Sequence, residues 1–443
     1  MKAVVRGGIG NEASVSVPGD KSISHRSLLL SLLASETYSV DGLSSALDVL
    51  ATKDIVETLG VHISQEGSRI ILRGVGFDIS EPNDFLDVGN SGTLIRLISG
   101  VLAGSEGNTF FLKGDSSIGK RPMGRVIDPL TKMGAKIIGR GYSTLAPLGI
   151  VGTKLHGIDY EMPVASAQVK SAILFAGLNS SGTTTLVETV PTRAHTEEML
   201  SQFGANLEVT RTPTANKISI EPSKLRPIDI KVPGDPSSAA FFVVLGLIGQ
   251  CSIEVTDVYL GPQRDGFLKT LISMGGRIDL SDKGNGLGDI KSYPSELSGV
   301  VVGPDGTPDL IDEVPILGVA AAMARGRTEF LGVGELRHKE SDRIATTCDM
   351  LASFGVDTGE LDGGFYVDGI GHDPSKGVLE SNGFVQEPRI VVSHYDHRIA
   401  MSGAILGALT QGETYIEGFE SVETSFPTFV SVFRSCGFEI EVR

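Results

Sequence analysis

The chain has 443 residues, which is enough for two or three domains that each bury a hydrophobic core. Hydrophobic residues make up 40% of the sequence and charged residues 21%, a composition typical of globular proteins and too apolar for a disordered chain. The formal net charge of −16 disfavours non-specific binding to nucleic acid or to anionic lipid.

Neither a membrane anchor nor an export signal is predicted. No apolar run approaches the roughly 18 residues that span a bilayer, and no apolar stretch of signal-peptide length follows Lys2. We therefore expect a cytoplasmic protein without a membrane partner. The three cysteines, Cys251, Cys348 and Cys436, are odd in number and far apart, which indicates neither a disulfide framework nor a zinc site.

One short pattern recurs six times: an amphipathic stretch, then a glycine, then a strand-like segment. Each copy predicts a helix that ends at a glycine and is followed at once by a strand. The six glycines are Gly60, Gly134, Gly204, Gly275, Gly355 and Gly437. Successive copies are 74, 70, 71, 80 and 82 residues apart, so the chain is expected to contain six similar α/β units.

A second set of six helices runs in step with the first and is predicted to be buried, because apolar or small residues surround each helix on nearly all sides. We expect these helices at residues 27–33, 94–102, 172–178, 239–248, 316–324 and 399–409. They begin near Ser22, Ser91, Ser166, Ser237, Glu313 and Asp396.

The six units group in threes. The segment Val-Ser-Val-Pro-Gly-Asp-Lys-Ser at residues 15–22 returns as Ile-Lys-Val-Pro-Gly-Asp-Pro-Ser at residues 230–237. This duplication predicts two crossings between two similar halves. We expect one domain at residues 20–234 and a second domain formed by residues 1–19 together with 235–443.

Cations and hydroxyl groups gather at the predicted starts of the buried helices in the first half. The first-turn N–H groups of a helix lack intrahelical partners and favour an anion. The candidate groups are Lys21, Ser22 and Arg26, the glycine-rich turn at residues 89–96, the basic turn at residues 120–125, the hydroxyl, amide and ammonium groups at the mouth of the helix at residues 166–171, and Arg193. Taken singly these signals are weak, because a solvated cap, a plain turn or a surface charge is the alternative explanation.

The second half contributes carboxylates as well as cations. Asp312 precedes a buried helix, where its carboxylate is either a cap or a general base. Lys339 and Arg343 are predicted to lie one turn apart on one helical face beside Glu340, as an anion site or as a surface ion-pair network. His397 and Arg398 begin the last buried helix. We expect both halves to face a cleft that binds two anionic small molecules, with Asp312 or Glu340 transferring protons.

Six motifs, in their order along the chain, resemble those of the enolpyruvyl transferases and, among them, the family of 5-enolpyruvylshikimate-3-phosphate synthases. They lie at residues 18–26, 89–93, 120–124, 165–171, 339–343 and 396–398. The Ser-Ala-Gln form at 166–168 and the Ser-Phe-Pro at 425–427 are similar to the bacterial class II branch. The resemblance implies two domains, each of three βαβαββ units with buried parallel helices. It also implies transfer of the enolpyruvyl group of phosphoenolpyruvate to the 5-hydroxyl of shikimate 3-phosphate, with release of phosphate through a tetrahedral intermediate.

The resemblance also implies a role for particular residues. Shikimate 3-phosphate would contact Lys21, Ser22, Arg26, Ser166, Ala167, Gln168, Arg193, Asp312 and Lys339. Phosphoenolpyruvate would contact Lys21, Asn90, Gly92, Arg121, Gln168, Arg343, His397 and Arg398. Asp312 would accept the 5-hydroxyl proton, and Glu340, helped by Lys21 or Lys339, would transfer the proton at the methylene carbon. No metal or organic cofactor is implied, and we expect a monomer with no nucleic-acid partner.

Two positions bear on how closely the chain follows the family. Many relatives carry a lysine just before a Thr-Phe-Pro segment, whereas residues 422–427 here are Val-Glu-Thr-Ser-Phe-Pro, so we leave this segment out of the site. Similar class II enzymes that tolerate glyphosate carry alanine at the position of Gly92. Because this chain keeps the glycine, we expect glyphosate to compete at micromolar levels. If the enzyme tolerated glyphosate, another residue, such as Leu97, would have to cause the tolerance.

Three alternatives stay open at this stage. The sister enzyme that acts on UDP-N-acetylglucosamine would share the fold and donor, but residues 114–120 lack its cysteine, and Ser22 stands where it has asparagine. An RNA 3′-phosphate cyclase would need a basic surface, which the charge of −16 disfavours. A two-domain binding protein that closes on an anion would have less need of Asp312 and Glu340.

Overall fold

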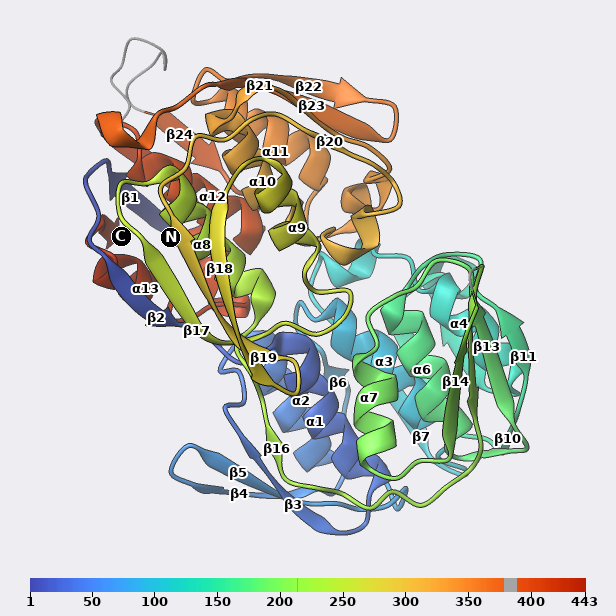
Figure 1. The fold of residues 1–443 in the computed structure, drawn as a ribbon. Helices are drawn as coiled ribbons and strands as arrows, with labels where there is room; N and C mark the ends of the chain where they lie inside the picture. The colour runs from blue at the N-terminus through green and yellow to red at the C-terminus, as the bar shows by residue number, and fades with distance from the viewer. Residues whose placement is uncertain (213, 378–388) are drawn as a thin grey trace. The chain divides into compact units, whose positions relative to one another are not determined.

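The computed structural model describes residues 1–212, 214–377 and 389–443. The chain forms two compact units, shown in Figure 1. One unit, here called the continuous unit, contains residues 19–232. The other, here called the split unit, combines residues 1–18 with residues 233–443.

The described residues of the continuous unit form three four-stranded sheets. Their strand orders are β16(Ile230–Lys231)-β3(Thr37–Asp41)-β5(Arg69–Arg73)-β4(His62–Glu66), β6(Leu86–Asp87)-β7(Thr109–Lys113)-β9(Leu145–Val151)-β8(Lys136–Gly139) and β11(Asp159–Glu161)-β13(Thr184–Glu188)-β15(Asn216–Ile220)-β14(Leu207–Arg211). A short parallel pair joins β10 (Leu155–His156) to β12 (Ser180–Ser181). The helices are α1 (Lys21–Leu33), α2 (Leu47–Thr58), α3 (Gly92–Ala103), η1 (Ile118–Lys120), α4 (Gly124–Lys132), α5 (Arg140–Ser143), α6 (Ala167–Gly177) and α7 (His195–Gln202).

The split unit repeats this organisation. Its sheets are β18(Arg277–Gly284)-β19(Leu287–Tyr293)-β17(Ile253–Tyr259)-β2(Ala13–Ser16), β20(Val301–Val302)-β21(Arg325–Phe330)-β23(Gly364–Ile370)-β22(Asp357–Leu361) and β24(Arg389–Val392)-β25(Glu413–Glu417)-β1(Lys2–Arg6)-β26(Glu439–Val442). Its helices are α8 (Pro236–Ile248), α9 (Gly266–Ser273), η2 (Thr307–Asp309), α10 (Val314–Met323), η3 (Gly334–His338), α11 (Arg343–Ala352), η4 (Pro374–Lys376), α12 (His397–Ala408), η5 (Phe419–Thr424) and α13 (Phe429–Ser435).

All six four-stranded sheets share one topology. In each sheet one edge strand pairs parallel with its neighbour, and the other two neighbouring pairs are antiparallel. In the sheet β6-β7-β9-β8, for example, β6 is parallel to β7, and β9 is antiparallel to both β7 and β8. This is the βαβαββ unit, so the predicted α/β fold is confirmed. Three strands pair with strands that are distant in the sequence. The strand β1 completes the last sheet between β25 and β26, β2 pairs with β17, and β16 pairs with β3, so each completes a sheet of its own compact unit.

The six predicted helix-ending glycines are confirmed. Each has a positive φ, between 74° and 108°, a region that glycine enters without a Cβ penalty. At the end of α2, for example, the Gly60 N–H donates to the Glu57 carbonyl and the Val61 N–H donates to the Val56 carbonyl. A strand begins two or three residues after each glycine. The repeat found in the sequence is therefore a repeat of helix ends.

The second set of helices forms the interior of each unit, as Figure 1 shows for α8, α10 and α12. Every residue of these three helices is buried, and they pack against one another, while α3 packs against α1 and α6. Side chains cap five of the six helices, accepting hydrogen bonds from first-turn N–H groups: Asp20, Ser91, Ser166, Asp235 and Asp396. The helices predicted to begin near Ser22 and Ser237 begin one residue earlier, at Lys21 and Pro236, because Asp20 and Asp235 are the caps. Among the described residues, no helix combines the length and apolarity needed to cross a membrane.

Candidate active site

The predicted site residues belong to both units, and each set is described within its own unit. The continuous-unit set consists of Lys21, Ser22, Arg26, Asn90, Gly92, Arg121, Ser166, Ala167, Gln168 and Arg193. The split-unit set consists of Asp312, Lys339, Glu340, Arg343, His397 and Arg398. Most of these residues lie at or next to the starts of buried helices.

The first turns of α1 carry two cations that other elements hold in place. The Lys21 ammonium lies 3.0 Å from a carboxylate oxygen of Asp48 on α2. Arg26 is buried, and its guanidinium donates to the Thr196 hydroxyl at 2.6 Å and to the Ser171 hydroxyl at 2.7 Å. Because these partners come from α7 and α6, three helices together fix the position of Arg26.

A histidine that the sequence analysis did not single out lies between these cations. His25 is fully buried, with Nδ1 2.6 Å from the Thr52 hydroxyl and Nε2 3.4 Å from the Ser91 hydroxyl. Burial, and then the charges of Lys21 and Arg26, hold the pKa of His25 well below its usual value. The imidazole is therefore neutral at physiological pH.

His25 should make the stability of the fold depend on pH. The unfolded chain takes up a proton near pH 6.5 and the folded chain does not, so the stabilising contribution is complete above that pH and is lost as the pH falls below it. We expect His25→Gln to reduce the pH dependence of the free energy of unfolding, between pH 6.5 and 5, by about 1.4 kcal/mol per pH unit. Urea unfolding at several pH values measures this slope. The exposed His62→Gln serves as the control, and an unchanged slope in His25→Gln would contradict the assignment.

Gly92, the first residue of α3, lies against two arginines. A Cβ placed on Gly92 would be 2.5 Å from Nη1 of Arg121 and 3.3 Å from Nη1 of Arg96. Arg96 also donates to the Gln168 side-chain carbonyl, and the Gln168 amide donates to the Thr93 hydroxyl at 2.9 Å. Arg96 ends the glycine-rich turn at residues 89–96, but no role was predicted for it. Its position one helical turn after Gly92 was the available signal.

Asn90 and Arg121 are joined in one network. The Arg121 guanidinium donates to the Ser117 hydroxyl at 3.0 Å and to the Asn90 side-chain carbonyl at 3.4 Å. Asn90 in turn donates to the carboxylate of Asp115 at 2.6 Å. Since Arg121 is buried, the network fixes a guanidinium beside the start of α3.

The start of α6 agrees only partly with its prediction. Ser166 caps the helix through the Val169 N–H, and Ala167 and Gln168 form the first turn, while Arg193 lies in the connection between β13 and α7. The ammonium of Lys170, however, does not lie at the helix mouth. Lys170 is 1% exposed and forms ion pairs with Glu188 and Glu197, because its long side chain turns into the interior. The prediction for Lys170 was therefore wrong.

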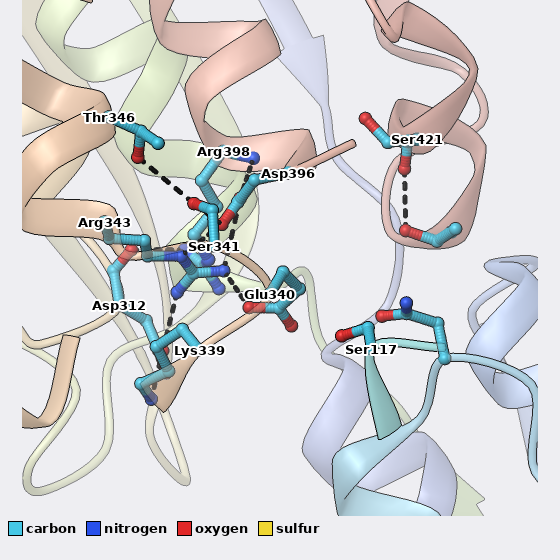
Figure 2. Close-up of polar contacts among 12 residues, drawn as sticks. Ser117, Asp312, Lys339, Glu340, Ser341, Arg343, Thr346, Asp396, Arg398 and Ser421 are labelled. Atoms are coloured by element: carbon cyan, nitrogen blue, oxygen red, sulfur yellow. Dashed lines mark hydrogen bonds and ion pairs between the residues drawn. The ribbon is translucent and has the colours of Figure 1, made fainter. Parts of the chain in front are cut away.

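In the split unit, Asp312 holds cations from two later segments. Its Oδ1 accepts from the Lys339 ammonium at 3.1 Å and lies 3.5 Å from Nη1 of Arg343. Its backbone carbonyl accepts from Arg398 at 2.7 Å. Figure 2 shows these contacts.

Arg343 is the centre of the split-unit set. It is 1% exposed, and it donates to Glu340 at 2.5 Å and to Asp396 at 2.8 Å, in addition to its contact with Asp312. Burial alone would lower the pKa of Arg343, but the charges of Asp396 and Glu340 raise it. Burial would likewise raise the pKa of Asp396, and the Arg343 charge lowers it instead. Both groups are therefore ionised at neutral pH.

The prediction that Lys339 and Arg343 share one helical face was wrong. Lys339 follows the short helix η3, and Arg343 is the first residue of α11. Between them, the Asp342 carboxylate accepts from the Ile344 and Ala345 N–H groups and so starts a new helix. Lys339 and Arg343 meet through Asp312 rather than through helical spacing. Burial lowers the pKa of Lys339, an effect that the nearby carboxylate of Asp312 opposes.

The segment left out of the site, residues 422–427, places two side chains in the core and exposes Glu423 and Pro427. Val422 and Phe426 are buried, and the Phe426 ring packs 5.7 Å from that of Phe429. Over residues 1–212, 214–377 and 389–443, no group of three or more His, Cys, Asp or Glu side chains has the arrangement of a metal site.

This architecture is that of the enolpyruvyl transferases. The chain is similar to the enolpyruvyl transferase NikO from Streptomyces tendae, with a TM-score of 0.73 at 15% identity over 99% of this chain and 98% of that one, a likeness of fold. It is also similar to the EPSP synthase from Acinetobacter baumannii, with a TM-score of 0.85 at 38% identity over all of both chains.

The sequence comparisons specify the family. Residues 6–433 match the family model of EPSP synthase (3-phosphoshikimate 1-carboxyvinyltransferase). Two curated relatives carry the name 3-phosphoshikimate 1-carboxyvinyltransferase. The protein from Pelotomaculum thermopropionicum is 46% identical over 95% of both chains. The protein from Caulobacter vibrioides is 44% identical over 96% of this chain and 95% of that one. The chain therefore belongs to the EPSP synthase family, and enolpyruvyl transfer in the shikimate pathway is its activity. The resemblance stated from the motifs is confirmed.

Proposed function

We propose that the chain transfers the enolpyruvyl group of phosphoenolpyruvate to the 5-hydroxyl of shikimate 3-phosphate, with cations of both sets holding anionic groups and the carboxyl groups of the split-unit set moving protons. The observation that carries this assignment of proton transfer is the arrangement around Arg343, whose guanidinium contacts the carboxyl groups of both Asp312 and Glu340. The continuous-unit set, by contrast, contains no carboxyl group among its ten residues.

Shikimate 3-phosphate suits the helix starts of α1 and α6. Its phosphate needs charge-assisted hydrogen bonds, and its hydroxyls need neutral partners. We assign to it Lys21, Ser22, Arg26, Ser166, the backbone of Ala167, Gln168 and Arg193, together with Asp312 and Lys339 of the split unit. The fixed position of Arg26 between Ser171 and Thr196 supports this role.

Phosphoenolpyruvate carries a carboxylate and a phosphate on the same carbon atom, so its site needs several cations. We assign to it Lys21, Gly92, Arg121, Gln168, Arg343 and Arg398, with Asn90 and His397 lining the site. The two guanidinium groups beside Gly92 support this role, because they approach a helix start from which backbone N–H groups also point.

The reaction requires one base and one acid. In the proposed mechanism, Asp312 accepts the proton of the 5-hydroxyl as that oxygen attacks the central carbon of phosphoenolpyruvate. Glu340, assisted by Lys21 or Lys339, gives a proton to the methylene carbon, which forms the tetrahedral intermediate. Loss of phosphate and of one methyl proton then restores the double bond. Preorganised cations would stabilise the negative charge at the phosphate and carboxylate. The proposal includes a cytoplasmic monomer that needs neither metal nor organic cofactor.

A phosphate-release assay tests the acceptor. The purified chain is mixed with phosphoenolpyruvate and either shikimate 3-phosphate or UDP-N-acetylglucosamine. We expect release with the first acceptor alone. Release with the sugar nucleotide alone would mean the sister reaction, and release with neither would leave the anion-binding protein as the better account.

Gly92 leads to a prediction about glyphosate, an anion that carries a carboxylate and a phosphonate. The unmodified chain should be inhibited competitively with phosphoenolpyruvate at micromolar glyphosate. In Gly92→Ala the Cβ would displace the end of the Arg121 side chain, so we expect the KM for phosphoenolpyruvate to rise about tenfold and inhibition to weaken further.

An inhibition titration measures both effects. Gly124→Ala is the matched control, since its Cβ would lie 3.8 Å from the nearest atom, an ordinary contact at the start of α4. Full activity of the unmodified chain at millimolar glyphosate would contradict the prediction and shift attention to Leu97.

A further inference from the structure

A buried ion cluster lies in the continuous unit, beneath the connection that carries Arg193. Lys170 of α6 is 1% exposed, and its ammonium lies 3.0 Å from a carboxylate oxygen of Glu188 and 2.6 Å from one of Glu197. It also donates to the backbone carbonyl of Thr192 at 3.2 Å. The mechanism proposed above gives none of these groups a role.

The cluster fixes the connection between β13 and α7 at both ends. Glu188 is the last residue of β13, and Glu197 lies in the first turn of α7. Between them, the Thr192 hydroxyl donates to Glu188 and the Thr192 carbonyl accepts from Lys170. One ammonium thus holds the strand end, the connection and the helix start, and Arg193 follows Thr192 directly.

The same cluster sets the surroundings of Arg26. Ser171 follows Lys170 on α6, and Thr196 precedes Glu197 on α7; their hydroxyl oxygens are 2.6 Å apart. Arg26 donates to both hydroxyls. The ion pair between Lys170 and Glu197 therefore holds α6 against α7 at the point where the two helices hold Arg26.

A gain in the stability of the fold does not by itself explain why Lys170, Glu188 and Glu197 are buried together. Burying three charged side chains has a desolvation cost that apolar side chains of similar volume would avoid. Burial raises the pKa of Glu197, which agrees with that cost. The cluster is better explained by the geometry it imposes on its neighbours.

We propose that Lys170, through its ion pairs with Glu188 and Glu197, is a positioning residue that sets Arg26 and Arg193 for the anionic groups of shikimate 3-phosphate. The proposal rests on the roles given above to these two arginines. It names no new contact with substrate. Its consequence is that loss of the cluster should weaken the binding of one substrate and not of the other.

The test compares steady-state kinetics of Lys170→Met and the unmodified chain. A displacement of the arginines by about 1 Å should raise the KM for shikimate 3-phosphate about tenfold or more, with the KM for phosphoenolpyruvate within about twofold. Lys170→Met leaves the carboxylates of Glu188 and Glu197 buried without their cation, which can prevent folding, so a second and milder variant is needed. Thr192→Val removes only the hydroxyl bond to Glu188, and it should raise the same KM severalfold.

Leu174→Ala is the matched control. Leu174 lies one turn further along α6 and is fully buried, so its truncation loosens the helix without touching the cluster. It should lower the melting temperature and leave both KM values unchanged. The proposal is overturned if folded Lys170→Met or Thr192→Val keeps the KM for shikimate 3-phosphate, or if Leu174→Ala raises it equally. If the unmodified chain released no phosphate with shikimate 3-phosphate, the proposed function itself would fail first.

Discussion

Replacing Asp312 by asparagine is expected to lower kcat about a thousandfold, because a positioned general base contributes roughly a hundredfold to ten-thousandfold. Asparagine keeps the size of the side chain and can still accept from Lys339 through its carbonyl oxygen. The backbone carbonyl that holds Arg398 stays in place. The variant therefore loses the base while the neighbouring cations keep their positions, and the KM for phosphoenolpyruvate should change little.

The measurement is kcat from phosphate release at saturating substrates. Asp305→Asn, an exposed acid in the segment before Asp312, is the control and should keep full activity. If Asp312→Asn kept more than about a tenth of the activity, another group would have to be the base.

Replacing Arg343 by methionine should have the largest effect on stability. The substitution removes a cation that contacts Asp312, Glu340 and Asp396, and it does so where the guanidinium is 1% exposed. Removing one partner of a buried ion pair costs about 3–5 kcal/mol, and here the fully buried Asp396 carboxylate would lose its guanidinium partner. We expect a loss of that size in the free energy of unfolding, together with loss of activity.

Urea unfolding of Arg343→Met and Arg337→Met makes the comparison direct. Arg337 also contacts two carboxylates, those of Asp342 and Glu360, but about a third of its side chain is exposed. Solvent screens such a pair, so Arg337→Met should lose much less. Equal losses in the two variants would mean that burial does not decide the strength of the Arg343 network.

The repeat could be predicted from the sequence because its signals are local. A glycine with positive φ ends each helix of the first set, and uninterrupted apolar residues mark each buried helix. Both depend on residues that are close in the chain. The pairing of β1 with β25 joins residues about 400 positions apart, so no local sequence pattern predicts it.

The site was predicted less completely than the fold. The contact of Arg343 with Asp396 spans 53 positions, so a sequence pattern could indicate two anion-binding motifs but not that one holds the other. The helical face assigned to Lys339 and Arg343 failed for a local reason: Asp342 is a helix cap, and that signal was present in the sequence. Lys170 was misplaced because the pattern at the start of α6 does not show which way a long side chain turns.

Paired KM measurements on Arg26→Met and Arg398→Met test the proposed substrate contacts most directly. Arg26 belongs to the continuous unit and Arg398 to the split unit. We expect the KM for shikimate 3-phosphate to rise about tenfold or more in Arg26→Met, and that for phosphoenolpyruvate to rise similarly in Arg398→Met. A rise in both KM values in each variant, or in neither, would contradict the assignment of Arg26 to shikimate 3-phosphate and of Arg398 to phosphoenolpyruvate.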